Sequence, residues 1–228
     1  MTAPFVVGVD GPSGSGKSSV SRAIATHLGG GYLDTGAMYR ALTWWCLESG
    51  LDLGDADAVI EAATTLPLAM SADPAYPGVH VGDTDVTEAI RASEISAQVS
   101  RVATIPEVRV EMQQQQRDLI TVIADDYGSV VAEGRDITTV VAPDADVRLL
   151  LTASEEARLR RRSAELHGET DDAAIERTRD EVVRRDQDDS TVSQFLTAAD
   201  GVVTLDTSDL TFEESVAAAL AVVDAARG

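Results

Sequence analysis

Short apolar runs alternate along the chain with longer segments in which apolar residues recur at helical spacing. The apolar runs predict buried strands at residues 5–10, 32–34, 129–133, 147–151 and 201–206. Helices are expected at residues 18–28, 37–48, 55–65, 93–124 with an interruption at Pro106, 154–185 with a polar break at 168–172, and 213–225. Strands that alternate with helices in this way predict an α/β protein with a parallel sheet.

The pattern changes between residues 64 and 92, where short alternating pieces are separated by Asp, Pro and Gly. Such pieces are typical of a small antiparallel sheet. We therefore expect residues of about 64–92 to form an insertion over the α/β core, in which His80 is a strand residue rather than a ligand.

One segment joins a predicted strand to a predicted helix through a glycine-rich loop. It reads Gly11-Pro12-Ser13-Gly14-Ser15-Gly16-Lys17-Ser18 and fits the phosphate-binding pattern G-x-x-x-x-G-K-[ST]. The N–H groups of such a loop meet a helix N-terminus, so they can bind polyphosphate oxygens. Lys17 is the only lysine of the chain and can follow a phosphoryl group as a mobile charge, and the Ser18 hydroxyl can coordinate Mg²⁺.

Length and composition fit one domain of 228 residues with an ordinary apolar content of 44%. No apolar stretch approaches the roughly 20 residues of a membrane span, and we expect no secretory signal. Cys46 is the only cysteine, which excludes a disulfide framework and fits the reducing cytoplasm. We therefore expect a cytoplasmic protein, and a monomer.

The net charge of −21, from 18 basic and 39 acidic residues, disfavours nucleic acid and anionic membranes as partners. Eight of the 17 arginines nevertheless lie between Arg158 and Arg185. This cluster indicates local anion binding, although Glu–Arg pairs on solvated helix faces account for some of it.

Three further motifs could carry chemistry, and two of them lie where ligands bind in parallel sheets. The segment Asp34-Thr35-Gly36-Ala37-Met38-Tyr39-Arg40 forms a strand-to-helix turn, and Glu133-Gly134-Arg135-Asp136 follows the third predicted strand. Both should reach the carboxyl edge of the sheet, beside the glycine-rich loop. Arg135 there could grip a phosphate, and Asp136 could accept a hydrogen bond from a base amino group. The third motif, Arg185-Asp186-Gln187-Asp188-Asp189-Ser190, ends the charged helices.

These motifs, with Ile137, Val140-Val141, Pro143-Asp144-Ala145 and Thr191, resemble those of bacterial cytidylate kinases, in order over nearly the whole chain. The resemblance implies a P-loop NTPase-type three-layer fold with a five-stranded parallel sheet. It also implies a monophosphate-binding insertion at about 64–92 and a mobile helical lid at about 156–182, with the core formed by 1–63, 93–155 and 183–228.

The activity implied by the resemblance is transfer of the γ-phosphate of ATP to CMP or dCMP, with Mg²⁺. Residues Gly11 to Ser19, including Ser18 and Ser19, would hold ATP. Lid arginines among Arg158, Arg161 and Arg162 would close on the transferring phosphate. Lys17 and Arg135 would act on the same phosphate as catalytic residues. The residues implied for CMP share this edge: Ser13, Arg40 and Arg135 for the phosphate, Ser100, Arg109 and Asp136 for cytosine, Asp34, Thr35 and Tyr39 for the pocket walls, and Arg185 and Asp189 for the sugar.

The chain departs from the family pattern after Thr191. The family usually continues with an arginine that helps to bind the monophosphate, whereas here Val192-Ser193-Gln194-Phe195 follows directly and the segment is about two residues short. If nothing replaces this arginine, its loss would cost roughly 1.5–3 kcal/mol of binding free energy. A milder departure is Thr138, where the family commonly has glycine.

Two alternatives remain open from the sequence. The first is a kinase of the same fold that acts on a small metabolite such as shikimate or on another monophosphate, which the Asp34–Arg40 motif and the insertion disfavour. The second is a nucleotide-binding regulatory protein without turnover, for which the missing arginine is the only support.

Overall fold

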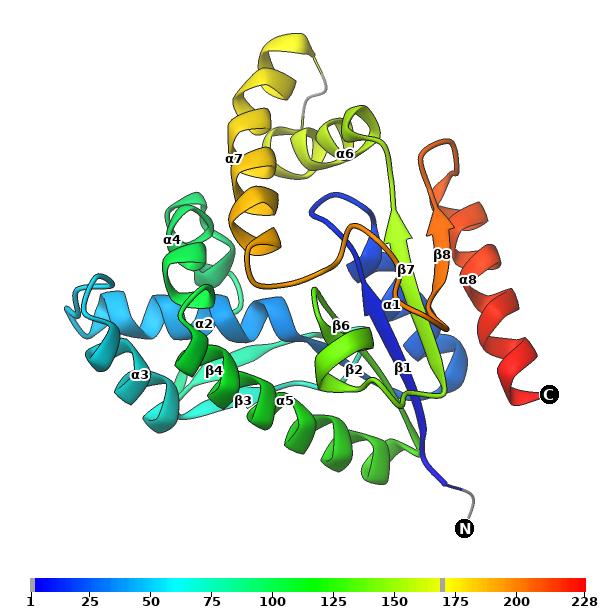
Figure 1. The fold of residues 1–228 in the computed structure, drawn as a ribbon, viewed down its shortest axis with the longest axis horizontal. Coiled ribbons are helices and arrows are strands. Elements are labelled where there is room, and N and C mark those ends of the chain that lie inside the picture. The colour runs from blue at the N-terminus through cyan, green and yellow to red at the C-terminus, as the bar shows by residue number, and fades with distance from the viewer. Residues whose placement is uncertain (1–2, 169–170) are drawn as a thin grey trace.

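Five parallel strands form the central sheet, in the order β2-β6-β1-β7-β8 (Figure 1). They are β1 (Phe5–Asp10), β2 (Gly31–Asp34), β6 (Ser129–Gly134), β7 (Val147–Thr152) and β8 (Val203–Asp206). The computed structural model describes residues 3–168 and 171–228, without the side chains of 165–167, 172, 177, 180, 181 and 185. The predicted α/β class with a five-stranded parallel sheet is confirmed.

Helices cover both faces of the sheet, so the central strands are apolar on both sides. One face packs against α1 (Lys17–Leu28) and α8 (Phe212–Arg227). The other face packs against α2 (Thr35–Glu48) and α5 (Pro106–Tyr127), and α3 (Ala56–Thr65) and α4 (Ser93–Ala103) pack on these two helices. All six residues of β6 are buried as a result. The remaining helices, α6 (Glu155–His167) and α7 (Asp172–Ser190), rise above the carboxyl edge (Figure 1).

The predicted antiparallel unit is also present. It consists of β3 (Leu68–Met70), β4 (Val79–Val81) and β5 (Thr84–Asp85), followed by a 3₁₀ turn at Ala89–Arg91. Apolar residues of this unit, including Val79 and Ile90, join the same hydrophobic core as α2 and α5. The unit is therefore packed on the α/β core, and it brings Arg91 back towards the carboxyl edge.

Some elements differ from the sequence expectations at their ends. Helix α7 continues to Ser190 rather than ending at 185, because its last turns are held by ion pairs with other segments. Helix α5 continues to Tyr127, where Gly128 ends it in the left-handed conformation. The last strand begins at Val203 rather than at 201, and a π-helical turn at Ile137–Val141 was not predicted.

Asp10 fastens that π-helical turn to the end of β1. Its carboxylate is 1% exposed and accepts hydrogen bonds from the N–H groups of Ile137 and Thr138 at 2.9 and 2.8 Å, and from Thr138 Oγ1 at 2.6 Å. Burial raises the pKa of Asp10 from 3.8 to about 6, against the opposing effect of the Thr138 hydrogen bonds. The hydroxyl at position 138 thus supports the ionised form of a buried acid.

Thr138→Val should lower the free energy of unfolding by about 1.5–3 kcal/mol at pH 8, because an ionised Asp10 loses a donor. The stability that Asp10 gains from its raised pKa is present at low pH and is lost as the pH rises through about 6. The cost of the substitution should therefore be smaller at pH 5, where the carboxyl is largely protonated. Urea unfolding at both pH values, with the half-buried Thr139→Val as control, measures this difference, and equal costs would contradict the role of Asp10.

Candidate functional site

The loop between β1 and α1 depends on glycine at two close approaches. Gly14 has a φ of 76°, and a Cβ added to it would lie 2.6 Å from the carbonyl oxygen of Arg158. A Cβ on Gly11 would lie 2.3 Å from the carbonyl oxygen of Leu151. Glycine therefore lets the loop pass tightly beside β7 and α6. Gly16, the N-cap of α1, offers no side-chain cap, which leaves the first N–H groups of the helix to meet an anion.

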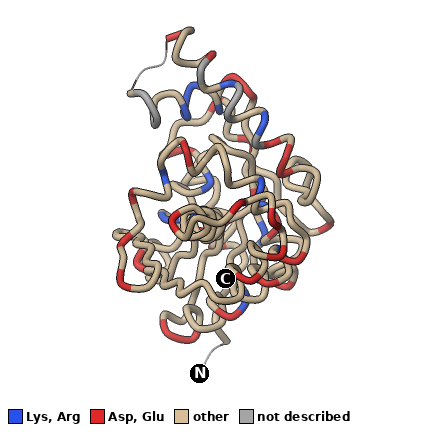
Figure 2. The backbone as a smooth tube through the Cα atoms, turned by 90° about the vertical axis from the view of Figure 1, so that its left-hand side faces the viewer, with Lys and Arg blue, Asp and Glu red and all other residues tan. Residues whose placement is uncertain are grey.

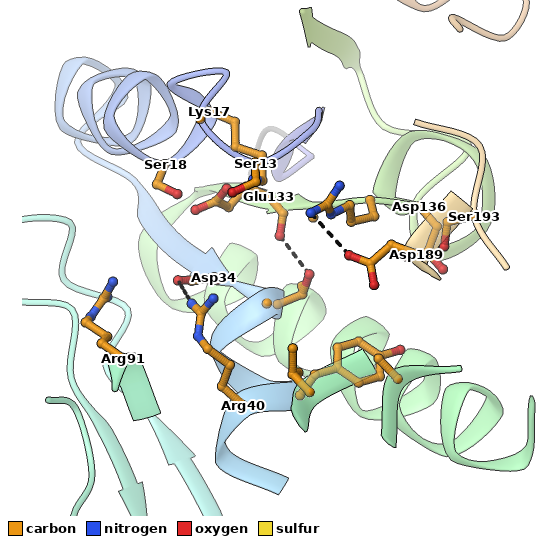
Figure 3. A pocket seen from close by; sticks show the side chains of 18 of the residues that line it. Ser13, Lys17, Ser18, Asp34, Arg40, Arg91, Glu133, Asp136, Asp189 and Ser193 are labelled. Carbon is orange, nitrogen blue, oxygen red and sulfur yellow. Dashed lines mark hydrogen bonds and ion pairs between the residues drawn. The ribbon is translucent and has the colours of Figure 1, made fainter. Parts of the chain in front are cut away.

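A pocket opens at the carboxyl edge of the sheet, where the loop meets the ends of β2 and β6 (Figure 3). Residues of α4, α6 and α7 complete its walls. Those that line it are Ser13, Gly14, Lys17, Ser18, Asp34, Thr35, Gly36, Tyr39, Arg40, Arg91, Val99, Ala103, Arg109, Glu133, Gly134, Arg135, Asp136, Arg162, Asp189 and Ser193.

A second pocket adjoins the first at the glycine-rich loop. It is lined by Gly14, Ser15, Gly16, Lys17, Ser18, Ser19, Val20, Arg91, Arg161, Leu210, Phe212 and Ser215. Four residues line both pockets, namely Gly14, Lys17, Ser18 and Arg91. They mark the junction at which a group could pass from a ligand in one pocket to a ligand in the other.

Glu133 is a buried carboxylate at this junction. Its Oε1 accepts a hydrogen bond from the Tyr32 hydroxyl at 2.6 Å, whereas its Oε2 has no partner of hydrogen-bond geometry among the described residues. Burial and the carboxylate of Asp34 raise the pKa of Glu133, while Lys17 and Ser18 oppose the shift. A buried oxygen beside a hydroxyl in this way is suited to a cation.

Most arginines of the first pocket are paired with carboxylates. The pairs, measured from nitrogen to oxygen, are Arg40–Asp34 at 3.3 Å, Arg109–Asp136 at 2.6 Å, Arg135–Asp186 at 2.7 Å and Arg135–Asp189 at 3.1 Å. Arg91 differs, since its side chain makes no ion pair or hydrogen bond with any described residue. Within the described part of the chain, no ion pair therefore compensates its charge at the junction of the two pockets.

Asp136 and Ser193 lie close together at one end of the pocket (Figure 3), and Arg109 contacts both. Asp136 Oδ2 accepts hydrogen bonds from Arg109 and from Gln113 Nε2, at 2.6 and 2.7 Å, which leaves Oδ1 without a described partner. Arg109 also donates to Ser193 Oγ at 2.8 Å. This end offers a fixed acceptor and a fixed donor to a ligand that carries both kinds of group.

The arginines of α6 point in different directions. Arg158 donates to the carbonyl oxygen of Ser13 at 3.0 Å and pairs with Asp186. Arg161 donates to Thr207 Oγ1 at 2.9 Å and lines the second pocket, whereas Arg162 lines the first. Figure 2 shows basic positions in the upper helices, while acidic positions follow much of the periphery. The basic residues of this acidic chain are thus concentrated near the site.

The structure brings together most of the residues expected from the sequence. Lys17, Asp34, Thr35, Tyr39, Arg40, Arg109, Arg135, Asp136, Arg162 and Asp189 all line the first pocket. Ser100 lines neither pocket, because its neighbours Val99 and Ala103 occupy that wall of α4. Gly11, Pro12 and Arg158 also stand outside both linings, and the side chain of Arg185 lies outside the described part of the chain.

Several residues of the site carry no role in the sequence expectations. They are Arg91, Gln113, Glu133, Asp186 and Ser193. Glu133 and Asp186 belong to two of the motifs described from the sequence, so their place in the site could have been predicted. Arg91 and Gln113 belong to no motif, and only the folding of the chain brings them to the site.

Two residues of the short segment after Thr191 contact arginines of the site. Ser193 reaches Arg109, and the fully buried ring of Phe195 lies under the guanidinium of Arg135, 4.2 Å from Cζ to the ring centroid. Where the family pattern has an arginine, this chain therefore supplies a hydroxyl and an aromatic support for another arginine.

Comparisons with known proteins agree over nearly the full length. A sequence model described as cytidylate kinase matches residues 7–225. The cytidylate kinase of Streptomyces avermitilis is 44% identical over 223 residues, which cover 97% of this chain and 94% of that protein. The cytidylate kinase of Rhodococcus opacus is 46% identical over 230 residues, which cover 100% of this chain and 98% of that protein.

Among solved structures, shikimate kinase from Acinetobacter baumannii in complex with shikimate aligns with 98% of this chain and 94% of its own. The identity is 16% and the TM-score 0.41, a likeness too low to bear on function.

Proposed function

The chain belongs to the cytidylate kinase family, and from that premise we propose that it transfers the γ-phosphate of ATP to CMP or dCMP. An oxygen of the monophosphate attacks the γ-phosphorus and forms a new P–O bond. The bond from the γ-phosphorus to the β–γ bridging oxygen breaks, which gives ADP and CDP or dCDP. The alternatives of a small-metabolite kinase and a non-catalytic binder gain no support from a family match over residues 7–225.

The observation that carries this proposal is the pair of pockets that share Gly14, Lys17, Ser18 and Arg91. In-line transfer needs a donor and an acceptor held end to end, with charge stabilisation where they meet. We assign ATP to the second pocket, at the loop and the start of α1, and the monophosphate to the first. Lys17 then stands at the shared junction, where its ammonium can accompany the transferring group.

The first pocket suits a cytidine monophosphate from end to end. Asp136 Oδ1 can accept from the cytosine amino group, and Arg109 can donate to the carbonyl oxygen and the ring nitrogen acceptor of cytosine. Arg40, Arg91 and Arg135 lie towards the loop and would meet the phosphate. Asp189 would bind the sugar hydroxyls, and the same role for Arg185 stays a prediction.

Mg²⁺ fits the donors present at the junction. The Ser18 hydroxyl would hold it, with the buried Glu133 carboxylate beside it. Among the described residues no group of three His, Cys, Asp or Glu side chains is arranged around a metal, so its other ligands would be phosphate oxygens and water. When bound, the ion neutralises phosphate charge.

The cytoplasmic setting stays a prediction. None of the helices in the described residues has the length and apolar character that crossing a membrane requires. The implied partners are ATP, CMP and dCMP, and the absence of nucleic-acid binding and the monomeric state stay predictions.

ADP release with Mg-ATP should be selective for CMP and dCMP in a panel that also contains UMP, AMP, GMP and shikimate. A coupled assay at matched concentrations measures this. Faster turnover of shikimate or AMP than of CMP would replace the proposed function with the first alternative, and no turnover with tight nucleotide binding would replace it with the second.

Asp136→Ala should relax discrimination between CMP and UMP, because only cytosine carries the amino donor that Oδ1 would accept. The ratio of kcat/KM for CMP to that for UMP should fall by about tenfold or more. The exposed Asp144→Ala is the control for charge. A ratio that stays at the wild-type value, whatever the loss of total activity, would show that Asp136 does not read the base.

Arg91→Gln should lower kcat/KM for CMP by roughly 10- to 150-fold, which corresponds to one charged hydrogen bond of about 1.5–3 kcal/mol. The exposed Arg101→Gln on α4 removes the same charge from a residue outside both pockets and should have little effect. Equal kinetics for the two variants would contradict a phosphate contact by Arg91.

A further inference from the structure

Asp186 joins three separate parts of the site with one carboxylate. It lies in the last turns of α7, with 9% of its side chain exposed. Its Oδ1 accepts from Arg135 Nη1 at 2.7 Å and from the N–H of Ser13 at 3.3 Å, and its Oδ2 accepts from Arg158 Nη1. The donors belong to the end of β6, to the glycine-rich loop and to α6.

The donor set around Asp186 is the kind that usually surrounds a phosphate. Two guanidinium groups and a loop N–H converge on its two oxygens, and charge-assisted bonds of this type are strong and directional. Although burial opposes it, the effect of Arg135 and Arg158 lowers the pKa of Asp186. The carboxylate is therefore ionised wherever the protein is folded near neutral pH.

Each arginine is also held at a second point, so that its orientation is fixed. Arg135 pairs with Asp189 at 3.1 Å and stacks on the buried ring of Phe195. Arg158 donates to the carbonyl oxygen of Ser13 at 3.0 Å, and its backbone lies against Gly14. Without Asp186, each guanidinium would keep only its second contact and would rotate more readily.

We propose that Asp186 is a positioning residue, which fixes Arg135 and Arg158 beside the loop before phosphoryl transfer begins. The inference rests on the proposed function, because the reaction that Asp186 would assist is the proposed phosphoryl transfer. Asp186 itself lines neither pocket. Its carboxylate neutralises two adjacent cations in the absence of substrate and keeps them in the geometry that the developing charge requires.

The kinetic signature of this role differs from that of a binding residue. In Asp186→Asn the amide keeps the shape and one acceptor oxygen, but it loses the charge that both arginines share. We expect kcat to fall by about 10- to 100-fold. KM for CMP and for ATP should stay unchanged or decrease, because a negative charge has been removed near two anionic ligands.

Asp188→Asn is the matched control. It lies two residues away on α7, removes the same charge, and makes no side-chain ion pair with a described residue. Its kinetics and its midpoint of thermal unfolding should equal those of the wild type. If Asp186→Asn does not fold, Asp186→Glu decides the matter, since it keeps the charge and shifts it by one methylene, and it should show a several-fold lower kcat at unchanged KM.

A second readout does not depend on the acceptor. NMR of the arginine side chains should show slow guanidinium rotation for Arg135 and Arg158 in the wild type and fast rotation in Asp186→Asn, with no change in Asp188→Asn. If the wild type turns over no acceptor, the proposed function fails, while this readout still tests the positioning role.

Three results would overturn the inference. An unchanged kcat with a lower KM would show that the carboxylate competes with phosphate for the arginines. An unchanged kcat with a higher KM would assign Asp186 to substrate binding. Guanidinium rotation that is the same in Asp186→Asn and the wild type would show that the carboxylate does not hold the arginines.

Discussion

Charge compensation at the carboxyl edge of the central sheet is the constraint on which the rest of the site depends. The chain carries a net charge of −21, yet its proposed ligands are polyanions. Most pocket arginines are therefore held in pairs with carboxylates from other segments, as Arg109 is with Asp136 and Arg135 with Asp186. Pairing keeps several guanidiniums close together without mutual repulsion, and it fixes their directions.

The order of the strands makes this arrangement possible. Because β1 lies between β6 and β7 and β2 pairs with β6, the glycine-rich loop, the Asp34 turn and the Glu133–Asp136 segment end side by side. The buried acids Asp10 and Glu133 then tie this edge together, since each accepts hydrogen bonds from a neighbouring segment. Burial raises the pKa of both acids, and the hydrogen bonds oppose that shift because they favour the ionised carboxylates.

The sequence predicts what is local and misses what depends on tertiary contacts. The strand, loop and helix around Lys17 follow from glycine spacing and apolar periodicity, and the five-stranded sheet follows from the alternation of elements and the family resemblance. The extension of α7 to Ser190 could not be predicted, because its last turns are polar and are stabilised by Arg135 and Arg158. Ser100 was expected in the pocket from the family pattern, whereas Val99 and Ala103 are the residues of α4 that line it, so the role of Ser100 stays a prediction.

The structure of a complex with CMP and a non-hydrolysable ATP analogue would test the central claim most directly. The account predicts the cytosine at Asp136 and Arg109, the monophosphate between Arg40, Arg91 and Arg135, and the carboxylate of Asp186 still bound to Arg135 and Arg158. A monophosphate that displaces the Asp186 carboxylate, or a base bound away from Asp136, would contradict it.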